Sequence, residues 1–146
     1  MHTREERLER LSRWGFNCTC AQCSLGDEES AASDARLALI EQLEADLNDF
    51  NETRVTAESG AELVRLYEQE RLVIYLGQAL TRAALNFALF GDLDRARAYA
   101  RAAADAVERE VGPHAQDAAS MRLLADNPKQ HWTWGKRRRR KSRGEK

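Results

Sequence analysis

The sequence predicts an all-α protein. Apolar residues recur at spacings of three and four between residues 33 and 125, which is the period of a helix that buries one face. Glycine and proline stand where these stretches stop. Three cysteines lie within six residues near the start of the chain, and basic residues gather at its end. We therefore expect a helix with a cysteine loop over residues 1–25, a helical region over 26–135 and a disordered basic tail over 136–146.

The first predicted helix is short and leads into the cysteine loop. Thr3 and Glu6 form a capping-box pattern, and Leu8 and Leu11 follow on one face before Gly15 ends the helix. The acidic residues 26–30 are expected to be a linker. A second helix is predicted over residues 33–50, with its apolar face formed by Leu37, Ile40, Leu43, Leu47 and Phe50.

The middle of the chain is predicted to supply the central helix of a bundle. Ser59 and Glu62 repeat the capping-box pattern, and the stretch that runs from them to Phe90 is apolar on more than one face. Gly91 and Asp92 end it and start the next helix.

Two further helices are expected after this turn. The first stops at Gly112 and Pro113 and carries a narrow stripe whose small residues permit close packing. The stripe consists of Ala96, Tyr99, Ala100, Ala103 and Val107. The second is expected over residues 114–125, before Asn127 and Pro128.

The three cysteines are predicted to bind a metal ion. Cys18, Cys20 and Cys23 form C-x-C-x-x-C, and the other residues include no further cysteine. This loop offers three of the four thiolates of a structural zinc site. The alternative is three unrelated reduced cysteines; a disulfide framework would need an even count. The three histidines are not at a ligand spacing from the loop, so a fourth ligand has to come from elsewhere.

Residues 7–23 resemble the post-SET segment of SET-domain protein lysine methyltransferases, especially the SET-and-MYND type and related fungal proteins. The matching positions are Trp14, Phe16, Cys18, Cys20 and Cys23. The resemblance implies that the cysteines bind zinc together with a cysteine of the SET core. It also implies that Phe16 packs beside the adenine of S-adenosylmethionine and that Trp14, where tyrosine is common, lines the target-lysine channel.

The SET core itself is missing from this chain. That core is strand-rich and carries an Asn-His pair and a catalytic tyrosine, and the residues before Cys18 are too few to encode it. We therefore assign no catalytic residue, and expect Met1 to be an internal methionine or the start of a truncated gene model. Residues 72–110 look like a tetratricopeptide-type (TPR-like) helical hairpin, which also follows the post-SET loop in the SET-and-MYND family. Because no 34-residue repetition is evident, an ordinary bundle stays open.

The charge of the chain is unevenly distributed. Residues 136–146 hold eight basic residues against one acid, a balance of +7, and the other 135 residues hold 15 against 23, a balance of −8. The basic run is expected to bury nothing and to be a nuclear-localisation signal, a phosphate-binding arm for weak, non-specific nucleic-acid binding, or a tail without a specific role. Trp132 and Trp134 before it are expected to dock onto the body rather than form a ligand cage.

Two functions fit these observations, and a third interpretation is an unstable fragment with no independent role. The first is the C-terminal part of a SET-domain protein lysine methyltransferase, which supplies the zinc loop and a helical module that shapes substrate access, and which is not catalytic alone. The second is a non-enzymatic helical adaptor with a metal-stapled loop and a nuclear-targeting tail, which would meet a nuclear import receptor. Because no apolar run is expected to approach the roughly 18 residues of a membrane span and no secretion signal is evident, we expect no membrane partner and a place in the nucleus or cytoplasm.

Overall fold

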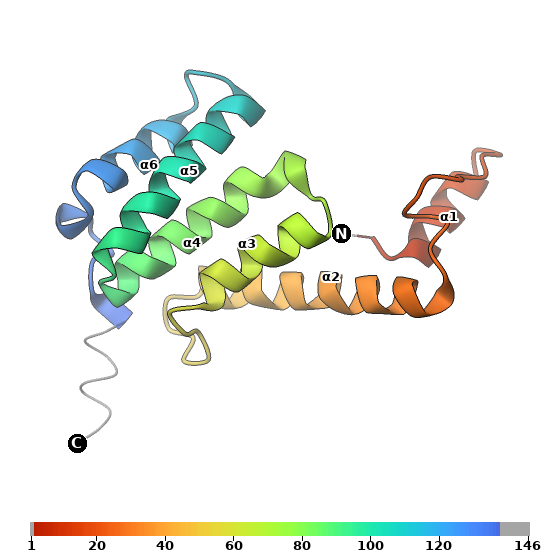
Figure 1. Ribbon diagram of the computed structural model, residues 1–146, viewed down its shortest axis with the longest axis horizontal. Helices are drawn as coiled ribbons and strands as arrows, with labels where there is room; N and C mark the ends of the chain where they lie inside the picture. The colour runs from red at the N-terminus through yellow and green to blue at the C-terminus, as the bar shows by residue number, and fades with distance from the viewer. Residues whose placement is uncertain (1, 138–146) are drawn as a thin grey trace. The chain divides into compact units, whose positions relative to one another are not determined.

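The computed structural model describes residues 2–137, and this part of the chain is helical with no strand (Figure 1). The all-α prediction is therefore confirmed for these residues. The chain divides into two compact units, Met1–Gln42 and Leu43–Lys146. The elements are α1 (Arg4–Ser12), α2 (Asp27–Asn48), α3 (Ser59–Gln69), η1 (Val73–Tyr75), α4 (Leu76–Phe90), α5 (Leu93–Val111), α6 (Gln116–Asp126) and η2 (Pro128–Gln130).

The first unit holds α1, the cysteine loop and most of α2. The predicted capping box is present: Glu6 N donates to Thr3 Oγ1 over 3.3 Å, and Thr3 N donates to Glu6 Oε2 over 2.9 Å. No residue of α1 is buried. This helix therefore adds almost nothing to a hydrophobic core and serves to hold the loop beside it.

The predicted acidic linker is wrong for residues 27–30, which form the first turn of α2. Ser30 N donates to the carbonyl of Gly26 over 2.8 Å. The three acidic side chains at the start of this helix lie at the positive end of its dipole, where negative charge is stabilising. A run of acidic residues is therefore compatible with the first turn of a helix as well as with a solvated linker.

The second unit is a row of helices, α3 to α6, each packed against the next (Figure 1). Its fully buried side chains include Leu63 and Tyr67 on α3, Phe87 on α4 and Leu124 on α6. Small residues let the helices approach closely: a Cβ added at Gly60 would lie 2.6 Å from the Cα of Ala83. Of the predicted stripe on α5, Ala96, Ala100, Ala103 and Val107 are buried and Tyr99 is half-buried; Ala104 and Ala106, which were not predicted, are buried as well.

The apolar stretch from residue 59 to 90 is two helices rather than one. The chain breaks at Arg71, which has a φ of +55°, and continues through η1 into α4. The capping box expected at Ser59 and Glu62 is also absent. Ser59 is already the first helical residue, and its Oγ accepts from Thr56 N over 2.9 Å. Helical spacing alone did not reveal this break, because apolar residues recur at the same spacing in the helix before it and in the helix after it.

The turn between α4 and α5 follows the sequence prediction. Gly91 adopts the left-handed conformation with a φ of +76°, which ends α4 without the steric cost that a side chain would add. Asp92 caps α5 by accepting from Arg95 N over 3.1 Å.

The segment after α6 folds back onto the second unit. Trp132 meets Phe50 edge to face at 5.4 Å between ring centroids, so its docking is confirmed, although 59% of Trp132 remains exposed. Arg137 is buried and donates to the carbonyls of Glu52 and Asp49 over 2.9 and 3.0 Å. The expectation that the basic run buries nothing is therefore wrong for Arg137; residues 138–146 lie outside the described part.

One segment, Val73–Phe90, has the length and mean hydropathy of a membrane span, with a mean hydropathy of 1.3 over 18 residues. The expectation that no apolar run approaches the length of a membrane span is therefore wrong for Val73–Phe90. Eight residues of α4 are buried, and α4 packs against both α3 and α5. Its apolar composition is that of a core helix.

Candidate metal centre

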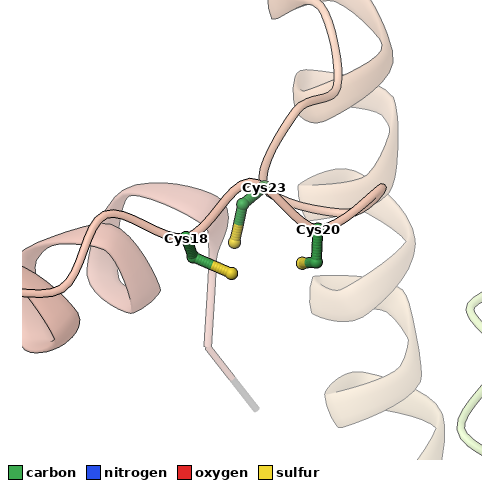
Figure 2. Close-up of side chains that lie close together, drawn as sticks. All are labelled: Cys18, Cys20 and Cys23. Carbon is green, nitrogen blue, oxygen red and sulfur yellow. The ribbon is translucent and has the colours of Figure 1, made fainter.

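The three cysteines form one group in the first unit. Figure 2 shows their side chains converging from a single loop, and all three Sγ atoms lie within 4.8 Å of one another. Thiolates bound to one tetrahedral zinc ion are about 3.8 Å apart, given a Zn–S distance of about 2.3 Å. The loop therefore needs a movement of only about 1 Å to hold such an ion, and the donor set is the one that zinc prefers.

A tight turn brings the sulfur atoms together. Ser24 N donates to the carbonyl of Cys20 over 2.9 Å, which closes one helical turn around the C-x-x-C half of the motif. Cys23 is buried, Cys18 is half-buried and Cys20 is exposed. One side of the group therefore faces the protein and the other faces solvent, where a fourth ligand can enter.

The loop makes the thiols unequal. A hydrogen bond from the backbone of Cys23, with further ones from the Cys18 and Cys23 side chains, lowers the pKa of Cys20 to about 7. Burial, followed by hydrogen bonds with Cys18 and Cys20, raises the pKa of Cys23. Metal binding requires thiolates. The Cys20 side chain is thus partly ionised to the metal-binding thiolate at neutral pH. The Cys23 thiol stays protonated, and binding of a metal cation would have to displace its proton.

Arg4 on α1 ties the loop to both of its neighbouring helices. Its Nε donates to the carbonyl of Cys23 over 2.9 Å, and its Nη1 lies 3.3 Å from Asp27 of α2. Its backbone N donates to Asp34 Oδ1 over 3.3 Å. On the other side of the loop, Gln22 Nε2 donates to Ser33 Oγ over 3.1 Å. Polar contacts, rather than apolar packing, therefore fix the loop in place.

The two aromatic residues ahead of the loop are exposed. Trp14 is 87% exposed and Phe16 is 56% exposed. Gly15 between them has a φ of +67°, and Phe16 N donates to the carbonyl of Leu11 over 3.1 Å. The structure thus places both beside the cysteine loop along the chain without enclosing either in a pocket.

No histidine or carboxylate joins the cysteine group among residues 2–137. The ring of His2 instead lies 2.7 Å from Arg10 Nη1.

The sequence did not indicate the open cleft between α1 and the start of α2. It has a volume of about 710 Å³ and is lined in part by the acidic residues Glu5, Glu9, Asp27 and Asp34. Neither Trp14 nor Phe16 lines it. The cleft could not be predicted from the sequence because residues 27–30, which form the first turn of α2, were expected to be a linker.

Comparison with known proteins gives no relative. No protein-family model, curated protein or solved structure matches this chain.

Proposed function

We propose that Cys18, Cys20 and Cys23 hold a zinc ion. The observation that carries this proposal is the convergence of three Sγ atoms within 4.8 Å of one another on a six-residue loop. A disulfide between two of them would leave the third unpaired, whereas zinc uses all three. Because three ligands leave one position open, the ion is held weakly by this chain alone or is shared with a neighbouring polypeptide.

Mass spectrometry under native conditions tests the zinc site directly. The full chain, purified with zinc, is expected to carry one ion per chain or per pair of chains. Single Cys→Ser changes at each of the three positions remove a thiolate and should remove the ion, whereas Thr19→Ala, in the same loop, should retain it. A zinc-free wild-type chain contradicts the proposal, as does retention of zinc by the serine variants.

The broader function that we propose is that of the C-terminal part of a SET-domain protein lysine methyltransferase. Support comes from the post-SET-like spacing of the motif and from the first unit, in which α1 buries none of its residues and Trp14 and Phe16 are exposed. Large apolar side chains beside a metal loop are typical of a surface that is completed by another polypeptide segment. In that arrangement Phe16 meets the adenine of S-adenosylmethionine and Trp14 lines the lysine channel.

Two measurements test this function. A reading frame continuous with Met1 that encodes an Asn-His pair, a further cysteine and a tyrosine is expected upstream. The chain alone should neither methylate protein substrates nor bind S-adenosylmethionine, because one exposed wall gives no concave enclosure. Micromolar cofactor binding by residues 1–146 in calorimetry contradicts the assignment.

The second candidate is a non-enzymatic helical adaptor with a TPR-like array. It is favoured by the second unit, which has its own core and exposes Val73, Ile74 and Tyr75 on η1. Replacing residues 138–140 with alanine, while keeping the buried Arg137, should then abolish nuclear accumulation of a fused reporter. Unchanged reporter distribution removes the targeting role.

A further inference from the structure

The cysteine loop also has the backbone geometry of an oxidation site. Cys20 and Cys23 are three positions apart, and Ser24 N donates to the carbonyl of Cys20 over 2.9 Å, which closes one helical turn around them. Residues at that spacing in a helical turn have Cα atoms about 5 Å apart. Disulfides form across Cα separations of about 4.4–6.8 Å. A disulfide between these two residues therefore needs little movement of the backbone.

The sulfur atoms are already close to one another. All three Sγ atoms lie within 4.8 Å of one another (Figure 2), and the S–S bond of a disulfide is about 2.05 Å long. Because the backbone spacing suits a disulfide, rotation of two side chains between staggered positions can bring two sulfur atoms together. The contacts that hold the loop, from Arg4 Nε to the carbonyl of Cys23 and from Gln22 to Ser33, involve no sulfur atom and can stay in place.

The three thiols differ in their access to solvent. Cys20 is exposed, Cys18 is half-buried and Cys23 is buried. An oxidant dissolved in water therefore meets the Cys20 sulfur first. Cys18 precedes the helical turn and does not share its three-residue spacing with Cys20. Exposure and backbone spacing together assign Cys20 as the thiol that is attacked and Cys23 as its partner.

Hydrogen peroxide is a small oxidant that suits this pair. The Cys20 sulfur, as a thiolate, attacks one peroxide oxygen and the O–O bond breaks. A sulfenic acid forms, and the hydroxide that leaves takes up the proton that Cys20 lost, giving water. The Cys23 sulfur then attacks the Cys20 sulfur, so the S–S bond forms and the S–OH bond breaks. The second hydroxide leaves with the proton of Cys23, again as water.

We propose that Cys20 and Cys23 are a reversible oxidation site, whose disulfide forms with peroxide and excludes the metal ion from the loop. The exclusion of the ion rests on the proposed zinc site, whereas the disulfide itself does not. Oxidation removes two of the three thiolates, and Cys18 alone is too small a ligand set for a zinc site. Zinc has no redox chemistry of its own, so both electrons come from the sulfur atoms and the ion leaves as Zn²⁺.

The experiment counts the free thiols of the full chain before and after treatment with hydrogen peroxide, by alkylation in denaturant and mass spectrometry. The reduced, metal-free chain is expected to take up three alkyl groups. The oxidised chain should take up one, on Cys18, and dithiothreitol should restore all three. The chain loaded with zinc should release its ion to a chromophoric chelator as the two thiols are lost.

Cys18→Ser and Cys20→Ser form a matched pair, because each leaves two thiols and removes one zinc ligand. With peroxide, Cys18→Ser is expected to lose both remaining thiols, whereas Cys20→Ser should keep both at the same dose. Three free thiols in treated wild type, equal behaviour of the two variants, or a disulfide between two chains on a non-reducing gel overturns the oxidation site and leaves the zinc site standing. If the disulfide forms but the reduced wild type binds no zinc, the zinc site fails and the oxidation site stands.

Discussion

Single residues set how closely the helices of the second unit can approach. The backbone of α4 lies against Gly60, where an added Cβ would be 2.6 Å from Ala83 Cα and 3.1 Å from its Cβ. Contact with backbone cannot be relieved by rotating a side chain, so one of the two helices would have to move.

Gly60→Ala is therefore expected to lower the free energy of unfolding by about 1–3 kcal/mol, as overpacking does. Helix propensity alone predicts the opposite sign, because alanine is favoured over glycine by about 1 kcal/mol. Urea denaturation decides between the two effects, and Ala61→Gly at the adjacent position measures the propensity term. A stabilised Gly60→Ala variant contradicts the close approach of α3 and α4.

Asp92 makes the start of α5 sensitive to acid. Partial burial raises its pKa, but hydrogen bonds from the Arg95 side chain and backbone outweigh this, so the pKa of Asp92 is lowered overall. A carboxyl with a lowered folded-state pKa contributes stability above its unfolded-state pKa, near pH 4, and loses it as the pH falls through the folded-state value.

Asp92→Asn should retain a cap but lose the charge, and so reduce the free energy of unfolding by about 0.5 kcal/mol at pH 7. The difference between wild type and variant should begin to shrink below about pH 4, the unfolded-state pKa, and should be lost as the pH falls through the lower folded-state pKa of Asp92. Urea titrations at a series of pH values measure it. If the difference in unfolding free energy between wild type and Asp92→Asn stays constant down to pH 2, the ionised carboxylate of Asp92 is not the source of that stability.

The C-terminal segment is an element whose role differs from the one its composition predicts. Arg137 belongs by composition to a solvated basic run, yet its guanidinium binds two carbonyls of the loop after α2, and Gly135 N donates to Ala88 of α4 over 2.9 Å. The segment therefore fastens the end of the helical row to its middle and to the loop at residues 49–52.

Arg137→Ala is expected to lower the free energy of unfolding by about 2 kcal/mol. The change removes two hydrogen bonds donated by a charged group and leaves the two acceptor carbonyls without that donor. Lys136→Ala is the control, since Lys136 lies over the exposed Trp132 ring at 4.4 Å and should contribute only about 0.5 kcal/mol. Guanidinium denaturation followed by tryptophan fluorescence measures both. Equal effects contradict the anchoring role of Arg137.

At the scale of the whole molecule, the two units are stabilised by different physical means. The second has a core of apolar side chains from four consecutive helices, whereas in the first α1 buries no residue and polar contacts hold the cysteine loop. A structural metal contributes folding free energy most where a core is lacking. Zinc should accordingly affect the first unit and leave the second unchanged.

Hydrogen exchange with and without zinc tests this difference. Zinc is expected to slow exchange of the backbone amides at residues 17–24, while amides in the middle of α4 and α5 exchange at the same rate in both conditions. The triple Cys→Ser variant should show no effect of zinc. Slower exchange throughout α4 and α5 would mean that the metal stabilises the second unit as well.

The sequence was most informative where the interactions are local. The Thr3–Glu6 capping box, the Gly91–Asp92 turn and the alanine stripe of α5 each depend on residues within a few positions of one another, and all are present. The cysteine group is local as well, because a six-residue spacing constrains three sulfur atoms to one small volume.

Tertiary contacts decided the rest. The burial of Arg137 depends on partners that lie elsewhere in the fold, because Arg137 is 85 and 88 residues from its two carbonyl acceptors. The sequence by itself thus determined most of the helices and the cysteine loop, because those follow from short-range spacing. Only the tertiary structure decided which charged side chains are buried, because that depends on which distant groups meet them.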